Sequence, residues 1–419
     1  MTGLEVFTQD SLPLWRPVRQ DLNRTVVTDL RADVAREFSQ VDACPPGARV
    51  AIGVGSRGID RLAEVVQAVV AEVRRRGAEP FVVPAMGSHG GATCEGQQSV
   101  LAEYGVTEAE VGAPVRSSME TVLVGTMDGI PIYFDRLASQ ADWIIPVNRV
   151  KPHTDFHGPI ESGLCKMITI GFGKQLGADT YHQRGFGRFP EIVPDAAEWL
   201  LARLPIPFGI ALVENGEGKL AHIEAVPRQG WVEHERRLLQ EARRRMARLL
   251  GDRIDVLIID QIGKDVSGIG ADTNVINRYY TGPLPETPAI QRIVVRSLTL
   301  STAGNASGLG LADVALARAV RQMDPLKTYM NCITAKTPEG ARIPITVETD
   351  RQALDVALAS CIGTVAEEAA VVRIRDTKHL ETFWASEPFA EPLLALGQLQ
   401  AMGAAQPIAF DAAGMLVEP

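Results

Sequence analysis

Four histidines that could carry acid–base or metal chemistry fall within one third of the chain: His89, His153, His157 and His182. Each stands in or beside a glycine-rich loop that follows a predicted strand. Imidazole changes charge near neutral pH and also binds metals, so it suits general acid–base catalysis and metal ligation. A single loop histidine is more often a hydrogen-bonded structural group, but several at one sheet edge favour a functional site. The other histidines, at 222, 234 and 379, have no comparable context.

The densest group of reactive side chains lies in the segment 147–174, which is too long and too charged to be a simple connection. Lys166 stands where this polar segment meets the apolar run 167–170. Partial burial there would favour its neutral, nucleophilic amine. The alternative is a surface lysine whose ammonium stays in water. Within 18 residues the segment holds Arg149, Lys151, His153, Asp155, His157, Glu161 and Lys166.

The common enzyme templates do not account for this pattern. His153 and His157 have a spacing that would place two zinc ligands on one helix face, but Pro152, Gly158 and Pro159 disfavour a helix there. The chain has no HExxH, Walker A or GxSxG motif, and no GxGxxG follows its first strand. The turn 55–58 (GSRG) is a weak phosphate-binding signal.

Alternating strand-like and helix-like segments position these loops. The sequence predicts strands over 49–53, 80–84 and 142–147, with a helix over 61–76 after the first of them. Further segments predict a helix near 94–104 and short strands around 120–125 and 130–134. Such alternation predicts an α/β domain with a mainly parallel sheet, whose ligands bind beyond the carboxyl ends of the strands.

A second α/β domain is expected after a charged helix over 230–250. It begins with a buried strand over 254–260, followed by the glycine-rich loop DQIGKDVSGIGADTN. We therefore predict domains of residues 1–254 and 255–387, a tail 388–419 that packs on the first domain, and an active site in the cleft between domains. The second domain is expected to contain a strand at 290–295, helices at 311–323 and 351–361, and a strand at 370–374.

Composition limits the partners and the compartment. The net charge of −9 over 419 residues disfavours nucleic acid as a binding partner. We expect the arginine runs 74–76 and 243–245 to lie on solvent-exposed helix faces. No apolar run is long enough to cross a bilayer, and the N-terminus does not have the pattern of a signal peptide. Five cysteines without a CxxC pair suit a reducing compartment, so we expect a cytoplasmic protein. The oligomeric state stays open.

Taken together, the motifs resemble those of the lactate racemase family. A Ser-Arg turn follows the first strand, a Gly-Ser-His loop follows the next, and a Pro-His pair precedes a Ser-Gly-x-x-Lys segment. A histidine then stands 16 residues after that lysine. The matching residues here are Ser56-Arg57, Gly87-Ser88-His89, Pro152-His153, Ser162-Gly163 with Lys166, and His182. The resemblance covers most of the chain and is strongest from 57 to 182.

The resemblance implies an isomerase that racemises or epimerises a 2-hydroxy acid with a nickel-pincer nucleotide, pyridinium-3,5-bisthiocarboxylic acid mononucleotide carrying nickel. Lys166 would hold this cofactor covalently through a thioamide, and His182 would bind the nickel. His89 and His153 would be the paired acid–base groups, and Arg57 would neutralise a carboxylate or phosphate. Hydride would leave C2 and return to the opposite face of a planar 2-keto acid. Ser88, Ser162 and Gly163 would complete the cofactor site.

Departures from the family pattern bear on the substrate. The interval from His153 to Lys166 is three residues longer than in the lactate enzymes, and Val54 stands near the family's aspartate. The family's substrate-contacting Gln and Lys match either Gln261 and Lys264 or positions near Asn277 and Tyr280. Closure of Lys264 and Arg278 onto a substrate carboxylate would form a gate. The loop resembles a branch distinct from the lactate enzymes, so a bulkier 2-hydroxy acid or a sugar acid is as compatible as lactate.

Two alternatives remain open at this point. One keeps the cofactor but performs a related hydride-transfer or elimination reaction. The other is a ligand-binding or regulatory protein of the same fold that has lost the cofactor. The leading hypothesis implies a small-molecule 2-hydroxy acid as substrate and the cofactor-biosynthesis enzymes as functional partners, with neither nucleic acid nor membrane as a partner.

Overall fold

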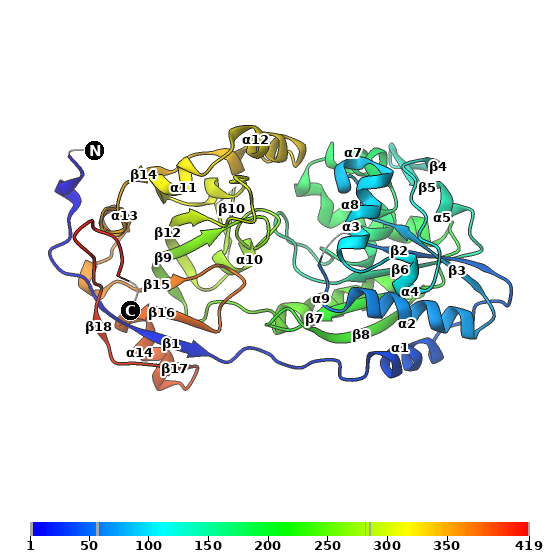
Figure 1. Ribbon diagram of the computed structural model, residues 1–419, viewed down its shortest axis with the longest axis horizontal. Coiled ribbons are helices and arrows are strands. Elements are labelled where there is room, and N and C mark those ends of the chain that lie inside the picture. Colours follow the sequence, from blue (N-terminus) through cyan, green and yellow to red (C-terminus); the bar gives the residue numbers. More distant parts are fainter. Residues whose placement is uncertain (1–2, 56–57, 281, 285, 418–419) are drawn as a thin grey trace. The chain divides into compact units, whose positions relative to one another are not determined.

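The computed structural model describes residues 3–55, 58–280, 282–284 and 286–417 (Figure 1). The chain divides into two compact units. The first unit is Asn23–Met246, and the second unit is Ala247–Pro419 together with Met1–Leu22. Both are α/β, as predicted, and each contains a sheet that is mostly parallel.

The first unit is built on a five-stranded sheet in the order β3-β2-β6-β7-β8. Its first four strands run parallel and only the edge strand β8 is antiparallel. The strand bounds are β2 Arg49–Val54, β3 Glu79–Pro84, β6 Trp143–Arg149, β7 Phe208–Glu214 and β8 Leu220–Pro227. The predicted strands over 49–53, 80–84 and 142–147 are therefore present in neighbouring positions.

Alternating side chains of the buried strands fill two cores, one on each face of this sheet. In β2, Val50 and Ile52 pack into the core shared with α1 (Leu30–Ser39) and α2 (Leu62–Arg75). Ala51 points to the opposite core, which contains α7 (Lys174–His182), α8 (Phe189–Leu201) and α9 (Trp231–Arg245). Figure 1 shows α1 and α2 on one side of the sheet and α7 and α8 on the other.

The remaining elements of the first unit surround this frame. Strands β4 (Thr121–Met127) and β5 (Ile130–Asp135) form a separate antiparallel hairpin with a bulge near Leu123, so the short strands predicted there exist outside the main sheet. Four short helices complete the unit: α3 Cys94–Glu103, α4 Glu108–Val111, α5 Arg136–Ser139 and α6 Leu164–Lys166.

The second unit contains a sheet in the order β14-β13-β12-β9-β15-β16-β1-β17, with β18 also paired to β1. Strands β14 through β15 in that order are parallel. Their bounds are β9 Arg253–Ile262, β12 Ala289–Leu298, β13 Val314–Leu316, β14 Ile345–Val347 and β15 Val371–Ile374. The antiparallel strands are β16 Thr382–Ser386, β1 Leu14–Gln20, β17 Leu399–Ala401 and β18 Gln406–Pro407.

Its helices are α10 Thr273–Ile276, α11 Ala317–Arg321, α12 Pro325–Thr334, α13 Asp350–Ala359 and α14 Glu387–Ala395, and a two-stranded ribbon joins β10 Arg278–Tyr279 to β11 Gly282–Pro283. The predicted helix 311–323 forms only over α11. Its first half is instead the buried strand β13, because Val314, Ala315 and Leu316 lie between two parallel neighbours.

Both ends of the chain lie in the second unit. Residues 1–22 and 247–254, which the sequence analysis placed in the first domain, belong to it. Strand β1 pairs with β16 through Trp15 opposite Ser386, and the tail strands β17 and β18 pair with β1 (Figure 1). The tail thus completes the sheet of the second unit.

Candidate active site

The loops that carry the candidate residues follow β3, β2 and β6, which are adjacent parallel strands. His89 follows β3, and the segment with His153 and Lys166 follows β6. The carboxyl ends of parallel strands share one edge of a sheet, so these loops leave the first unit's sheet at the same edge. Ser56 and Arg57, after β2, lie outside the described residues.

His153 and Lys166 are in direct contact. His153 is buried, with 8% of its surface exposed, and its Nε2 contacts the Nζ of Lys166. The other ring nitrogen, Nδ1, accepts a hydrogen bond of 3.0 Å from the Asp155 backbone N–H, and it lies 3.6 Å from the Asp155 carboxylate. The ring also packs against Phe156, with centroids 4.5 Å apart.

Two tautomers of a neutral His153 are compatible with these contacts. In one, Nδ1 accepts the hydrogen bond and the ring carries its hydrogen on Nε2. That hydrogen points to Nζ, which can accept it only as a neutral amine. The other tautomer places the ring hydrogen on Nδ1, beside the Asp155 carboxylate, and lets a Lys166 ammonium donate to Nε2. A protonated lysine beside a protonated histidine would place two like charges in a buried site.

Two phenylalanines connect this pair to His182. Lys166 Nζ lies 5.7 Å from the Phe156 ring centroid, and the Phe156 and Phe189 centroids are 5.4 Å apart. His182, the last residue of α7, stacks on Phe189 at 5.6 Å with an interplanar angle of 6°. Both phenylalanines are buried, so His153, Lys166 and His182 are arranged around one rigid aromatic pair.

The loop that carries His153 is stabilised by hydrogen bonds between its two ends and to a buried carboxylate within it. Its ends are joined by mutual backbone hydrogen bonds between Lys151 and Ser162. The Glu161 side chain is fully buried and accepts hydrogen bonds from the backbone N–H of His153 at 2.6 Å and of Gly158 at 3.0 Å. It also pairs with His157 Nδ1 at 3.1 Å and with Arg243 of α9.

These partners give His157 and Arg243 a role in holding the loop. The sequence analysis treated the run 243–245 as a solvated helix face, whereas Arg243 contacts the buried carboxylate of Glu161. The acidic residue eight positions after His153 was the sequence signal for such an internal partner.

The turn that carries Lys166 is hydrogen-bonded to a buried carboxylate. Lys166 ends α6, and a π-helical turn, Met167–Gly171, follows directly; such turns are common at functional sites. Glu235 of α9 is buried and accepts the Cys165 backbone N–H at 2.8 Å, and burial raises the pKa of Glu235 to about 7. A Cβ at Gly163 would lie 2.1 Å from Glu235 Oε1, so only glycine lets the turn approach this carboxylate.

Gly163 and Ser162 have structural contacts beside their predicted cofactor role. Asn148 Nδ2 donates to the Gly163 carbonyl at 2.8 Å, and Ser162 closes the His153 loop. Ser88 is half-buried, and His89 is exposed at the residue before the short helix Gly90–Ala92.

A fully buried lysine links the His89 loop to the helix of His182. Lys174, at the start of α7, has no exposed surface and pairs with Asp135 Oδ2 at 2.8 Å. Its Nζ also donates to the Pro84 carbonyl at the end of β3 and to Gln97 Oε1. Gln97 in turn donates to the Gly87 carbonyl at 2.9 Å and to the His89 carbonyl at 3.3 Å.

Sequence reasoning missed this network and the two phenylalanines. A lysine after Gly171-Phe172-Gly173 reads as a surface residue, and burial of a single charged side chain leaves no local pattern. A signal was present in Asp135, a carboxylate placed directly after an apolar strand.

Apart from Arg57, which lies outside the described residues, the predicted substrate residues lie in the second unit. Gln261 is near the end of β9, and Lys264 is exposed in the following loop with its Nζ near the Gly268 carbonyl. Asn277 is buried and donates to the Pro288 carbonyl at 3.1 Å. Tyr280 is half-buried.

Arg278 has internal partners for most of its guanidinium. It pairs with Asp313 at 2.6 Å and donates to the carbonyls of Leu311, Ile290 and Gln291 at 3.1, 3.2 and 2.9 Å. These four bonds occupy four of five N–H donors, which favours a role in fixing the loop over direct capture of a carboxylate.

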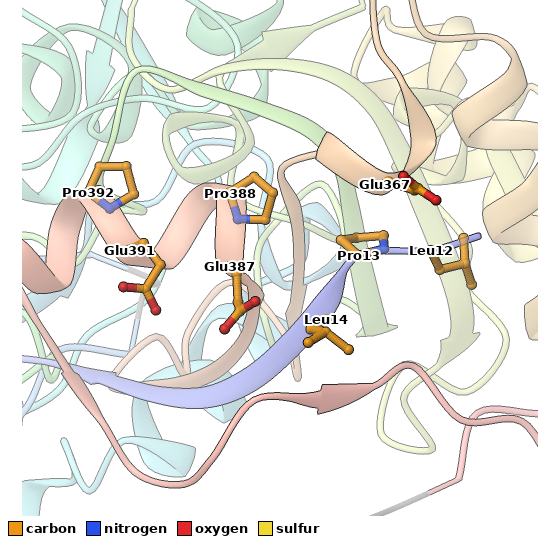
Figure 2. Close-up of a pocket in the computed structure, with 8 residues that line it drawn as sticks. All are labelled: Leu12, Pro13, Leu14, Glu367, Glu387, Pro388, Glu391 and Pro392. Atoms are coloured by element: carbon orange, nitrogen blue, oxygen red, sulfur yellow. The ribbon is translucent and has the colours of Figure 1, made fainter.

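Two other kinds of feature are absent from the described residues. Within them, no three His, Cys, Asp or Glu side chains gather closely enough to hold a metal ion. No helix in the same described ranges is long and apolar enough to span a membrane. A hollow of approximately 560 Å³ beside β1 and α14 is lined by prolines, leucines and glutamates, among them Glu387 and Glu391, which pair with Arg16 (Figure 2). None of the predicted site residues is in its lining.

Comparison with known proteins adds one similarity. No protein-family model and no curated protein matches this chain. Among solved structures, the chain is similar to the lactate racemase apoprotein from Thermoanaerobacterium thermosaccharolyticum, with 14% sequence identity and a TM-score of 0.48, over 89% of this chain and 85% of that chain.

Proposed function

We propose that this protein is a racemase or epimerase of a 2-hydroxy acid that uses a nickel-pincer nucleotide, attached to Lys166 and bound through nickel by His182. One observation carries the proposal. Three residues that the sequence motifs singled out, His153, Lys166 and His182, gather around the buried Phe156–Phe189 pair.

The chemistry of these residues suits the cofactor. A neutral Lys166 amine is the form that can attack a carbonyl or thiocarbonyl carbon, and its Nζ is in contact with His153 Nε2, a group that can take up the amine's proton. The His182 imidazole is a nitrogen donor that would suit nickel, and the stacked Phe189 ring fixes its plane. When bound, the cofactor supplies a hydride acceptor, which a protein side chain does not offer.

The residues of the chain then handle protons and orientation. With the cofactor attached, Lys166 would no longer have a free amine beside His153, which would leave His153 Nε2 to exchange a proton with the substrate hydroxyl. His89, on the loop after β3, would do the same for the opposite isomer. Two imidazoles suit a reaction that must run in both directions at one pH.

The proposed substrate contacts are less specific. Arg57 would bind the carboxylate from the loop after β2, and Ser88 would support the cofactor. In the second unit, Lys264 and Gln261 are the proposed substrate contacts, whereas the side chains of Arg278 and Asn277 bind carbonyls within the unit. The enzymes that make the cofactor are the proposed functional partners.

Intact-protein mass spectrometry tests the proposal. The chain is produced together with the cofactor-making enzymes, and we expect an added mass and about one nickel per chain. Lys166→Ala should abolish the added mass, and His182→Ala should lose nickel while the adduct remains. Lys151→Ala, in the same loop, is the matched control and should keep both. Absence of adduct and nickel in the unaltered chain would contradict the proposal and favour a cofactor-less ligand-binding protein.

Isotope tracing separates racemisation from elimination or another related reaction. Candidate 2-hydroxy acids are incubated with the loaded protein in deuterated water, and both isomers are analysed. Internal hydride return predicts that hydrogen at C2 is retained in the inverted product. Deuterium at C2 would instead show exchange with solvent and would refute hydride transfer.

A further inference from the structure

A second polar cavity lies in the second unit, at the carboxyl edge of its parallel strands. It has a volume of approximately 540 Å³. Asp260 and Gln261 line it from the end of β9, Arg296 from β12, Arg318 from α11 after β13, and Arg375 from the end of β15. Ligands of open α/β sheets bind at this edge, beyond the carboxyl ends of the strands.

Cations outnumber anions in the wall of this cavity. Three guanidinium groups and one carboxylate are among the lining side chains. The carboxylate, Asp260, already accepts hydrogen bonds from Arg296 at 2.7 Å and from Arg373 at 2.9 Å. Asp350, 2% exposed at its side chain, binds Arg296 through two further bonds of 2.8 Å. The nearest acids are therefore already used to hold Arg296 and Arg373.

Arg318 and Arg375 have weaker anionic contacts. Arg318 donates through Nε to the Arg296 carbonyl at 2.8 Å, and its Nη2 lies 4.0 Å from Asp350. Partial burial and the neighbouring charge of Arg296 lower the pKa of Arg318, as expected where two guanidinium groups are crowded. The Arg375 side chain is 67% exposed, and its Nε is 3.5 Å from Asp376.

We propose that this cavity is a binding site for a small dianion with carboxylate or phosphate groups. Arg296 is fixed by its two aspartates and forms a rigid positive floor, while Arg318 and Arg375 provide planar donors for oxygen atoms. A dianion would offset the crowding of the guanidinium groups, whereas a monoanion would do so only in part. Its lining residues belong to the second unit, and one of them, Gln261, is also a proposed substrate contact.

Calorimetric titration of the full chain with inorganic phosphate, and separately with succinate, tests the site. Acetate at matched ionic strength is the monoanion control. We expect saturable binding of at least one dianion and a Kd for acetate roughly tenfold higher or more. Preference for phosphate would indicate a phosphorylated metabolite, and preference for succinate a dicarboxylic acid; either supports the site. No saturable dianion binding at millimolar concentration would overturn it.

Variants link the binding to the cavity. Arg318→Gln and Arg375→Gln should each raise the Kd of the dianion by roughly tenfold or more. The matched control is Arg321→Gln in the same helix, because Arg321 is exposed and pairs with Glu348 outside the lining. Arg375 is exposed enough for its variant to fold. If both variants bind as the unaltered chain does, the arginine cluster is a structural ion-pair network only, and the proposal is refuted.

Discussion

Replacement of Lys174 by methionine should destabilise the first unit strongly. Both side chains of the Lys174–Asp135 pair have no exposed surface, and the two atoms that pair are 2.8 Å apart. Methionine keeps most of the volume but leaves the Asp135 carboxylate buried without its cation. Loss of one partner of a buried ion pair typically costs about 3–5 kcal/mol. Domains are stable by only about 5–15 kcal/mol, so this is a large fraction of the total.

Urea unfolding followed by tryptophan fluorescence measures the effect. Because the chain has two units, Trp15 and Trp384 of the second unit are first replaced by phenylalanine, so that the three tryptophans of the first unit report alone. Lys219→Met is the matched control. Lys219 pairs with Asp60 at 3.2 Å with 57% of its side chain exposed, and such surface pairs contribute about 0–1 kcal/mol.

A double-mutant cycle then isolates the pair. Asp135→Asn retains a side-chain oxygen for the Ala138 backbone N–H at 2.8 Å, so it tests the charge more than the helix cap. The double variant Lys174→Met/Asp135→Asn should be more stable than the sum of the single losses predicts, by about 1–3 kcal/mol. Equal losses for Lys174→Met and Lys219→Met, with no coupling in the cycle, would refute the view that this pair joins α7 to the His89 loop.

Three further changes test the supports of the His153–Lys166 pair. Gly163→Ala should cost about 1–3 kcal/mol in a denaturation experiment, because its Cβ would overlap Glu235, whereas Gly187→Ala meets nothing within 4 Å. Burial raises the pKa of Glu235 to about 7, so the stability of the native chain should fall as pH rises from the unfolded value through 7. Glu235→Gln should remove that fall and be more stable above pH 7 by up to roughly 3 kcal/mol; unchanged pH dependence would contradict this. Glu161→Gln should speed amide hydrogen exchange over 151–162 by tenfold or more, while the exposed Glu191→Gln should leave it unchanged.

Local sequence patterns were sufficient for β2, β3 and β6 of the first unit's sheet, whereas β7 and β8 were not predicted. Continuous apolar runs at Arg49–Val54 and Glu79–Pro84, with an amphipathic helix Leu62–Arg75 between them, allow only a buried parallel arrangement. The same reasoning failed at Val314–Leu316, where a three-residue strand has no period of its own and takes its identity from the strands beside it.

Long-range pairing explains the error at the chain ends. Trp15 lies opposite Ser386, across almost the whole sequence, and no local pattern reports such a partner. The segment Leu14–Gln20 therefore read as part of the nearest domain, although its sheet is built from the distant end of the chain.

The candidate site, like the fold, was predicted only in part from the sequence. The motifs identified the residues with reactive side chains. They did not identify the residues that fix those side chains in place, because such contacts depend on which groups are buried in the fold. Lys166 and His182 are 16 residues apart, and a continuous α-helix of that length would separate their backbones by about 24 Å. Lys174, between them, has a φ of +54°, which interrupts the helical run and starts α7 in a new direction. A left-handed lysine costs of order 1 kcal/mol or more, so it persists only where its surroundings require it. Here the surroundings are the buried partners of the Lys174 ammonium, namely Asp135, Gln97 and the end of β3. Lys174 therefore both interrupts the helical run and connects α7 to the His89 loop.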